Sequence, residues 1–294
     1  MTAPFGTRLR HAFDAYGRLC VGIDPHAFLL EQWGLPDDAS GVLSLGLRVV
    51  DAAAGSVGIV KPQVAFFERF GSAGYAALER VLASARDAGL VVIADVKRGD
   101  LGTSVEAYGQ AWLTPGAPLE ADAMTISAFQ GVGSIAAPMA LATETGKGLF
   151  VLAATSNQEA ARIQRARVDP ASGEESDETR TVARVIIDDV TRYNAQEHGT
   201  RSDSAIGSVG VVLGATLDIA AYGIDVTSSA TPAAPVLAPG FGHQGAKLSD
   251  AARIYGALLP ATIISESRSV LAAGPGGIVD AIARRAGEVR QAIG

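Results

Sequence analysis

Short apolar runs recur along the chain, separated by longer stretches of mixed composition. We predict β-strands at eight of these runs, residues 19–24, 57–61, 91–97, 122–127, 149–154, 208–213, 235–238 and 262–266. Most of the runs are continuously apolar, whereas a strand with one solvated face alternates apolar and polar positions. The pattern therefore predicts a parallel sheet that is buried on both faces.

The stretches between the runs are compatible with helices, most clearly at residues 72–88, 178–197 and 276–292. In the first of these, apolar residues recur at helical spacing on one face, namely Tyr75, Leu78, Val81, Leu82 and Ala85. Eight alternating strand and helix units predict an α/β fold, a closed (β/α)8 TIM barrel. A doubly wound open sheet is the structural alternative.

Two stretches do not fit a minimal alternation of strands and helices. Residues 156–180 are polar, charged and long for a connection, so we expect either a mobile lid or a surface insertion there. Residues 223–235 are rich in Thr, Ser, Ala and Pro and are predicted to form a loop. We expect a single barrel domain that spans residues 1–294.

The composition limits where the protein can be located and what it can bind. No apolar run is long enough to span a membrane, and the N-terminal residues lack the apolar segment of a signal peptide. Cys20 is the only cysteine, which excludes an intrachain disulfide and fits a cytoplasmic location. The net charge of −7 argues against general nucleic-acid binding. We therefore expect a cytoplasmic protein that binds neither a membrane nor nucleic acid.

Polar residues follow the apolar part of several predicted strands, at the end where a (β/α)8 barrel carries its active site. These residues are Asp24, Lys61, Asp95, Lys97, Asp100, Thr155, Ser156, Asn157 and Arg268. The distribution predicts a ligand site at one mouth of the barrel.

Asp95 and Lys97 are two residues apart on a strand, so we expect their side chains to point to the same side. Lys61 would come from the adjacent strand, and each charge would favour the ionised form of its neighbour. A structural salt-bridge network is the alternative explanation. Because Asp100 follows within three residues and other strand ends are also polar, we favour a functional site.

The segment 239–246 and Arg268 lie where TIM barrels bind phosphate, after the seventh and eighth strands. Backbone N–H groups at its glycines can approach an anion, Gln244 adds an amide donor, and Arg268 can bind phosphate oxygens in a bidentate manner. The same segment matches the dinucleotide motif G-x-G-x-x-G, but that motif belongs in a first βαβ unit. A phosphate-bearing ligand is therefore predicted.

The sequence gives no indication of a metal site. No two of His11, His26, His198 and His243 have the spacing of metal ligands. We interpret Cys20 as a core residue and His243 as a solvated loop residue.

Taken together, the motifs resemble those of the orotidine 5′-phosphate decarboxylases, in their bacterial type 2 subgroup. The segment DVKRGD resembles the family signature D-x-K-R-G-D, and the agreement covers most of the chain. The matching segments are VGIDPH (21–26), VKPQVAFFERFG (60–71), DVKRGD (95–100), TSN (155–157), PGFGHQG (239–245) and SRSV (267–270). The resemblance implies a homodimeric TIM barrel that converts orotidine 5′-monophosphate to UMP and CO2 in pyrimidine synthesis, without metal or organic cofactor.

The resemblance also implies the roles of individual residues. Lys61, Asp95, Lys97 and Asp100 would form the catalytic set of charges, with Lys97 stabilising and protonating a C6 carbanion and Asp100 reaching the partner subunit's site. Asp24 would hold the ribose, Ser156 the pyrimidine ring, and Gln244 and Arg268 the phosphate. Ser104 would contact the ribose across the dimer. The family usually has D-I-G-x-T here, and this chain departs from it, so Thr103 is the alternative.

Three other functions share parts of this pattern. A metal-dependent sugar-phosphate decarboxylase or synthase of the same superfamily shares D-x-K-x-x-D, but such relatives place an acidic ligand where this chain has Lys61. A Schiff-base aldolase needs a neutral Lys97, which the neighbouring aspartates disfavour. A catalytically silent phosphate-binding protein would have no need of the intact set of charges.

Overall fold

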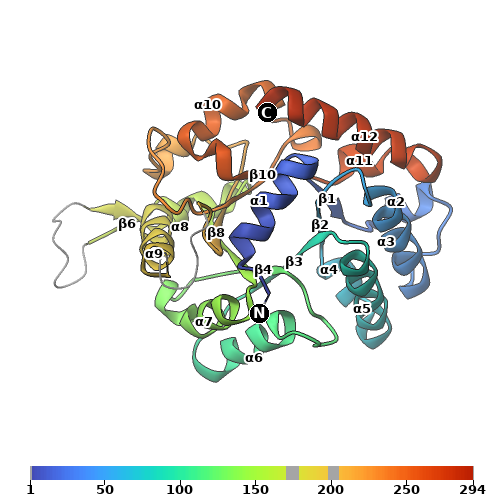
Figure 1. The fold of residues 1–294 in the computed structure, drawn as a ribbon, viewed down its shortest axis with the longest axis horizontal. Coiled ribbons are helices and arrows are strands. Elements are labelled where there is room, and N and C mark those ends of the chain that lie inside the picture. The colour runs from blue at the N-terminus through green and yellow to red at the C-terminus, as the bar shows by residue number, and fades with distance from the viewer. Residues whose placement is uncertain (1, 170–178, 198–204, 294) are drawn as a thin grey trace.

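Eight parallel strands close into a barrel in the computed structural model, which describes residues 2–169, 179–197 and 205–293 (Figure 1). They are β1 (Leu19–Ile23), β2 (Ile59–Pro62), β3 (Val91–Arg98), β4 (Ala123–Ile126), β5 (Gly148–Ala154), β8 (Val209–Leu213), β9 (Val236–Pro239) and β10 (Thr262–Glu266). Each overlaps one of the predicted apolar runs. Because β1 pairs with both β2 and β10, the predicted barrel is confirmed and the open sheet is excluded.

Helices surround the barrel (Figure 1). The longer ones are α1 (Phe5–Tyr16), α3 (Ala39–Ala53), α5 (Gly71–Asp87), α6 (Gly102–Leu113), α7 (Ala136–Thr145), α9 (Val182–Glu197) and α12 (Gly274–Ile293). The shorter ones are α2 (Ala27–Gln32), α4 (Ala65–Glu68), α8 (Ala161–Gln164), α10 (Ala251–Tyr255) and α11 (Arg268–Leu271). Short 3-10 helices are η1 (Val132–Ile135), η2 (Gln158–Ala160), η3 (Ile219–Tyr222), η4 (Gly242–Gln244), η5 (Leu248–Asp250) and η6 (Gly256–Ala261).

The helix predicted at residues 178–197 begins later than expected, at Val182. Residues Arg180–Thr181 instead form β7, which pairs in antiparallel fashion with β6 (Arg167–Val168). The Thr181 hydroxyl accepts a hydrogen bond from the Arg184 N–H at 3.1 Å, the geometry of a helix N-cap. Residue 178 lies outside the described residues, and the prediction was wrong for residues 179–181.

The apolar face predicted for α5 packs against the barrel. Leu78, Val81, Leu82 and Ala85 are buried, whereas Tyr75 is partly buried and donates a hydrogen bond to Glu68 at 2.9 Å. These residues belong to the large cluster between the strands and the outer helices. The helical spacing in the sequence therefore identified the buried face correctly.

A second apolar cluster fills the inside of the barrel. Phe5, Leu9 and Phe13 of α1 pack there against side chains of the strands, including Phe150. Gly148 is required beneath this helix, because a Cβ at that position would lie 2.4 Å from the Phe5 ring. The helix α1 thus closes the amino-terminal end of the barrel.

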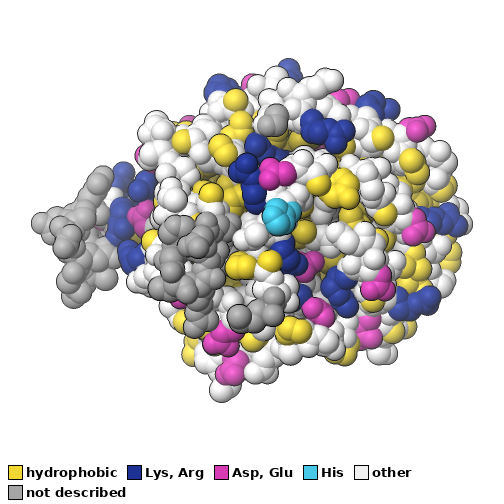
Figure 2. All heavy atoms as spheres, viewed as in Figure 1, with side chains coloured by type: hydrophobic (Ala, Val, Ile, Leu, Met, Phe, Trp, Pro, Cys, Tyr) yellow, Lys and Arg dark blue, Asp and Glu magenta, His cyan; other side chains and the backbone are white. Residues whose placement is uncertain are grey.

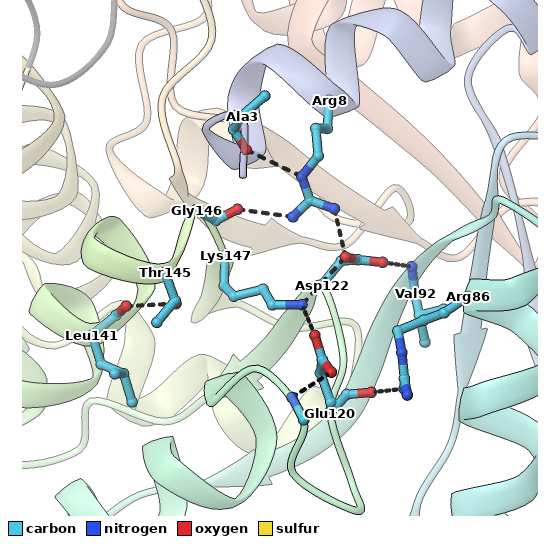
Figure 3. A network of polar contacts seen from close by, with 11 residues as sticks. Ala3, Arg8, Arg86, Val92, Glu120, Asp122, Leu141, Thr145, Gly146 and Lys147 are labelled. Atoms are coloured by element: carbon cyan, nitrogen blue, oxygen red, sulfur yellow. Dashed lines mark hydrogen bonds and ion pairs between the residues drawn. The ribbon is translucent and has the colours of Figure 1, made fainter. Parts of the chain in front are cut away.

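Charged side chains fix α1 to that end, and we call this group the base cluster: Arg8, Glu120, Asp122 and Lys147 (Figure 3). Arg8 donates to Asp122 at 2.5 Å and to the Gly146 carbonyl at 2.8 Å. Lys147 donates to Glu120 at 2.6 Å. The other carboxylate oxygen of Asp122 accepts the Val92 N–H at 2.8 Å, so the cluster joins α1 to β3 and to the start of β4 and β5.

The structure describes part of the first stretch that did not fit the alternation of strands and helices, residues 156–180, and all of the second, residues 223–235. Within residues 156–180, the described part contains η2, α8 and the β6–β7 pair, while residues 170–178 lie outside the described residues. Residues 223–235 form the predicted loop, apart from one isolated bridge between Ile206 and Ala233.

The face that carries α1 shows side chains of both charges interspersed, with no broad area of a single sign (Figure 2). Within the described residues, no helix combines the length and apolar composition needed to cross a bilayer.

Candidate active site

A cavity of about 340 Å³ opens at the carboxyl ends of the strands. Its lining includes seven predicted site residues, Asp24, Lys61, Asp95, Lys97, Ser156, Gln244 and Arg268. Leu152, Val212 and Leu237 add an apolar wall from β5, β8 and β9. Residues far apart in the sequence therefore meet at the mouth of the barrel, as predicted.

Asp95 joins two lysines, and we call these three residues the mouth cluster. Its two carboxylate oxygens accept hydrogen bonds from Lys61 Nζ at 2.7 Å and from Lys97 Nζ at 2.5 Å. Only 8–9% of the Asp95 and Lys61 side chains is exposed, whereas 46% of the Lys97 side chain is exposed. Lys97 is therefore the cation of this cluster most accessible from the cavity.

Burial and ion pairing act in opposite directions on these groups. Burial alone would raise the pKa of Asp95, but the charges and hydrogen bonds of Lys61 and Lys97 outweigh it and hold that pKa well below its usual range. Burial alone would lower the pKa of Lys61, but the charges of Asp95 and Asp24 raise it above the ordinary lysine value. Both groups are therefore ionised at neutral pH.

The backbone of Lys97 adopts the left-handed conformation, with φ of 47°, and no other non-glycine residue in the described part of the chain has a positive φ. For a residue with a side chain this conformation costs about 1–2 kcal/mol. The pairing of β3 with β4 shifts register between Ala94 and Arg98, which surround it. Strain that persists beside a cavity indicates a functional constraint.

Asp24 and Ser267 bring unpaired polar atoms to the same cavity. Asp24 Oδ1 and Ser267 Oγ are buried and have no hydrogen-bond partner among the described residues. Buried polar atoms without a partner are costly. Both residues line the cavity, although these two oxygen atoms are themselves covered.

The other wall comes from the loop that holds η4 and from the start of α11. Ser156 donates a hydrogen bond to Gln244 at 3.2 Å, and Arg268 lies at the start of α11. Gly242 has φ of 67°, and a Cβ there would lie 2.7 Å from a carboxylate oxygen of Glu266. Glycine is thus required for the close approach of this loop to β10.

The glycine motif does not form a dinucleotide site of the open-sheet type. Gly242 begins a 3-10 turn of three residues, whereas the dinucleotide motif opens a long helix. His243, interpreted as a solvated loop residue, is exposed and also lines the cavity.

Asp100 and Ser104 are not brought into the cavity of their own chain. Asp100 is partly buried and accepts the Leu101 N–H at 2.9 Å, while Ser104 is exposed in the first turn of α6. The proposed roles of these residues involve a second subunit, so the single chain does not test them.

Thr125 is a site residue that sequence reasoning missed. It is 1% exposed, lines the cavity and donates a hydrogen bond from Oγ1 to Asp95 Oδ1 at 2.9 Å. The available signal was a hydroxyl inside the apolar run of residues 122–127. That signal is weak because threonine is common in strands.

Metal-binding groups do not gather in the described residues, where no three His, Cys, Asp or Glu side chains are placed to hold an ion. Cys20 is buried in the inner cluster, as predicted. Burial raises the pKa of its thiol to about 12, which disfavours the reactive thiolate.

Comparison with known proteins agrees with the geometry. Residues 17–279 match the family model described as orotidine 5′-phosphate decarboxylase / HUMPS family. The chain is 48% identical to the orotidine 5′-phosphate decarboxylase of a Nocardioides species over 91% of this chain and 92% of that protein. It is 47% identical to that of Salinispora tropica over 92% and 91% of the two chains.

A solved structure shows the same arrangement of the chain. The crystal structure of a Streptomyces avermitilis protein assigned to the same enzyme class superposes with a TM-score of 0.88 at 43% identity, covering 99% of this chain and 96% of that one. With the fold, the site and these relatives in agreement, the chain belongs to the orotidine 5′-phosphate decarboxylase family of carboxy-lyases.

Proposed function

We propose that the cavity binds orotidine 5′-monophosphate and converts it to UMP and CO2. The observation that carries this proposal is the mouth cluster, in which a buried carboxylate holds the accessible ammonium of Lys97 beside the cavity. The named activity of the curated relatives supports the same substrate.

In the proposed reaction, the bond between C6 of the pyrimidine and the carboxylate carbon breaks and CO2 leaves. The electron pair stays on C6, where the ring cannot easily delocalise it. The Lys97 ammonium stabilises this charge and then gives its proton to C6, after which the amine regains a proton from solvent. Fixed charges aimed at a developing charge commonly supply the largest part of catalysis.

Asp95 and Lys61 support Lys97 in this scheme. Asp95 orients the ammonium through the 2.5 Å contact and lies near the position of the departing carboxylate. Lys61 neutralises Asp95 from the opposite side at 2.7 Å, which allows the carboxylate to stay ionised although it is buried.

The remaining walls of the cavity suit the other parts of the substrate. Asp24, which lines the cavity, would accept hydrogen bonds from the ribose hydroxyls. Ser156 would contact the pyrimidine ring, while Gln244 and Arg268 would bind the phosphate.

We further propose a homodimer in which Asp100 and Ser104 complete the partner subunit's site. Large apolar side chains are exposed beside them, with Leu101 58% and Phe129 77% exposed. The two loops that carry these side chains are adjacent, because a Cβ at Gly99 would lie 2.5 Å from the Ser127 carbonyl oxygen. Exposed apolar side chains on adjacent loops would be covered in such a dimer, which supports this surface as the interface.

Residues 156–180 are proposed to act as a lid over the site. Gln164 of α8 accepts the Thr155 N–H at 2.9 Å and donates to the Thr155 hydroxyl at 3.0 Å, so this segment is tied to a residue of the cavity wall. Binding energy from the phosphate, remote from C6, would favour the closed arrangement and exclude water.

The test is loss of the orotidine 5′-monophosphate absorbance on addition of the protein, with and without EDTA. We expect decarboxylation at the same rate in both conditions. Absence of the reaction would contradict the proposed function. A rate abolished by EDTA would contradict the proposed metal-independent reaction. The buried Lys61 is poorly suited to a metal site because its positive charge repels a metal ion.

A further inference from the structure

Thr125 occupies an unusual position in β4. Its side chain is almost fully buried, and the flanking strand residues Ala123, Met124 and Ile126 are apolar. A hydroxyl offers one hydrogen to donate and lone pairs that accept. In this position both capacities are used, and both partners belong to β3.

The direction of each hydrogen bond follows from its partner. The Lys97 backbone N–H is 3.0 Å from Thr125 Oγ1 and can only donate, so the hydroxyl oxygen accepts. The Asp95 carboxylate is ionised and can only accept, so the hydroxyl donates to its Oδ1 at 2.9 Å. The result is a chain of two hydrogen bonds that runs from the Lys97 backbone to Asp95.

The same carboxylate oxygen also receives the Lys97 ammonium at 2.5 Å. Thr125 therefore restrains Lys97 at both ends, directly at its backbone and through Asp95 at Nζ. The backbone end is the strained one, with φ of 47° at the register shift between β3 and β4.

We propose that Thr125 is a positioning residue of the reaction, holding the left-handed backbone of Lys97 and the carboxylate of Asp95 so that the ammonium meets C6 of the substrate. The proposal rests on the proposed function. It assigns the effect to the hydroxyl and not to the volume of the side chain, because a methyl group would fill the same space without making either hydrogen bond.

Thr125→Val removes the hydroxyl and keeps the side-chain volume, whereas Thr125→Ser keeps the hydroxyl and reduces the volume. We expect the valine variant to lose about 10–100-fold in kcat with KM within about threefold of wild type, since a small displacement of a catalytic group is costly. The serine variant, which keeps the hydroxyl, should retain kcat within about fivefold of wild type. Should the valine variant fail to fold, Thr125→Ala removes the same hydroxyl and is subject to the same kcat criterion.

Thr262→Val is the matched control. Thr262 is also fully buried in a barrel strand and donates to the Leu258 carbonyl at 2.9 Å, but it lies at the amino end of β10, outside the cavity lining. This variant should lower the melting temperature as Thr125→Val does and leave kcat unchanged.

Three results would overturn the inference: an unchanged kcat for Thr125→Val, equal losses for the valine and serine variants, or an equal loss for the control. In each case a wild-type protein that decarboxylates orotidine 5′-monophosphate leaves the proposed function standing. A wild-type protein without that activity would overturn the proposed function and this inference together.

Discussion

The mouth cluster and the base cluster are each centred on an aspartate that contacts two cations, but their surroundings differ. In each, one aspartate near the end of a barrel strand contacts two cations, Lys61 and Lys97 for Asp95, and Arg8 and Lys147 for Asp122. At the base both cations are largely covered, with Lys147 5% exposed, and the hydrogen bonds run to other parts of the same fold (Figure 3). At the mouth, Lys97 is 46% exposed beside a cavity.

The difference shows how ion pairs of one chemical kind serve two purposes. Arg8, Asp122 and Lys147 hold α1 and the strands together, so their contribution is to the free energy of folding. The mouth cluster instead keeps one strained lysine accessible, and a group held in this way is available for chemistry. Exposure and backbone conformation distinguish the two clusters, while the pattern of one aspartate between two cations does not.

The largest expected effect is on catalysis at the mouth. Lys97→Ala should lower kcat by about 10³–10⁴-fold, because it removes both the charge and the proton donor. The absorbance assay measures this loss, and circular dichroism checks that the variant is folded. Activity within tenfold of wild type would exclude Lys97 as the proton donor.

Subunit mixing tests whether the mouth is completed by a second chain. Lys97→Ala and Asp100→Ala proteins should each be nearly inactive alone, and mixing them under subunit exchange should restore about a quarter of the wild-type activity, since half of the dimers then hold one intact site. No recovery, with exchange verified by a labelled subunit, would remove Asp100 from its role in the partner's site.

A substitution in the base cluster should lower the stability of the protein and leave its catalysis almost unchanged. Lys147→Met leaves the carboxylates of Glu120 and Asp122 with one cation fewer in a buried setting, so we expect a loss of about 3–5 kcal/mol in the free energy of unfolding. Urea denaturation measures it, and kcat of the folded variant should stay within about twofold of wild type because no group at the cavity changes. A large fall in kcat with unchanged stability would break the distinction between the clusters.

Lowering the pH should reduce the contribution of the Asp95 ion pairs in the mouth cluster to stability. The folded-state pKa of Asp95 lies below the ordinary value of 3.8, so its stabilising effect is present above about pH 3.8 and is lost as the pH falls toward the folded value. Asp95→Asn should therefore be less stable than wild type at neutral pH. The difference in the free energy of unfolding between the two proteins should become smaller below pH 3.8. Urea denaturation at several pH values checks this. If this difference in the free energy of unfolding does not change with pH, the charge of Asp95 does not contribute to stability.

The fold was predictable from the sequence because buried parallel strands are continuously apolar, and each of the eight runs overlaps a strand. The start of α9 was not predictable, because Thr181 pairs with Arg167 of β6 and caps the helix, and the helical spacing of apolar residues specifies neither contact. Asp95, Lys61 and Lys97 were found because charges at strand ends are rare and stand out.

Other parts of the site depend on the folded structure. The left-handed backbone of Lys97 lies within the register shift of β3 against β4, which no local pattern in the sequence specifies. Thr125 is an ordinary strand residue until its two partners on β3 are known. Asp100 was noticed among the charges at the strand ends, whereas its proposed role in a partner subunit and the role of Ser104 came from the family resemblance.

The inner cluster of the barrel has a consequence for the order of synthesis. It unites Phe5 and Leu9, near the start of the chain, with Ile263, near its end, and it includes Val212 and Leu237 of the cavity wall. A ribosome delivers α1 before the barrel strands, and its apolar partners on β9 and β10 emerge only after the intervening strands and helices have been made. The apolar wall of the active site is thus among the last parts of the molecule to be completed, and the apolar face of α1 must stay unburied, or be shielded by other contacts, until then.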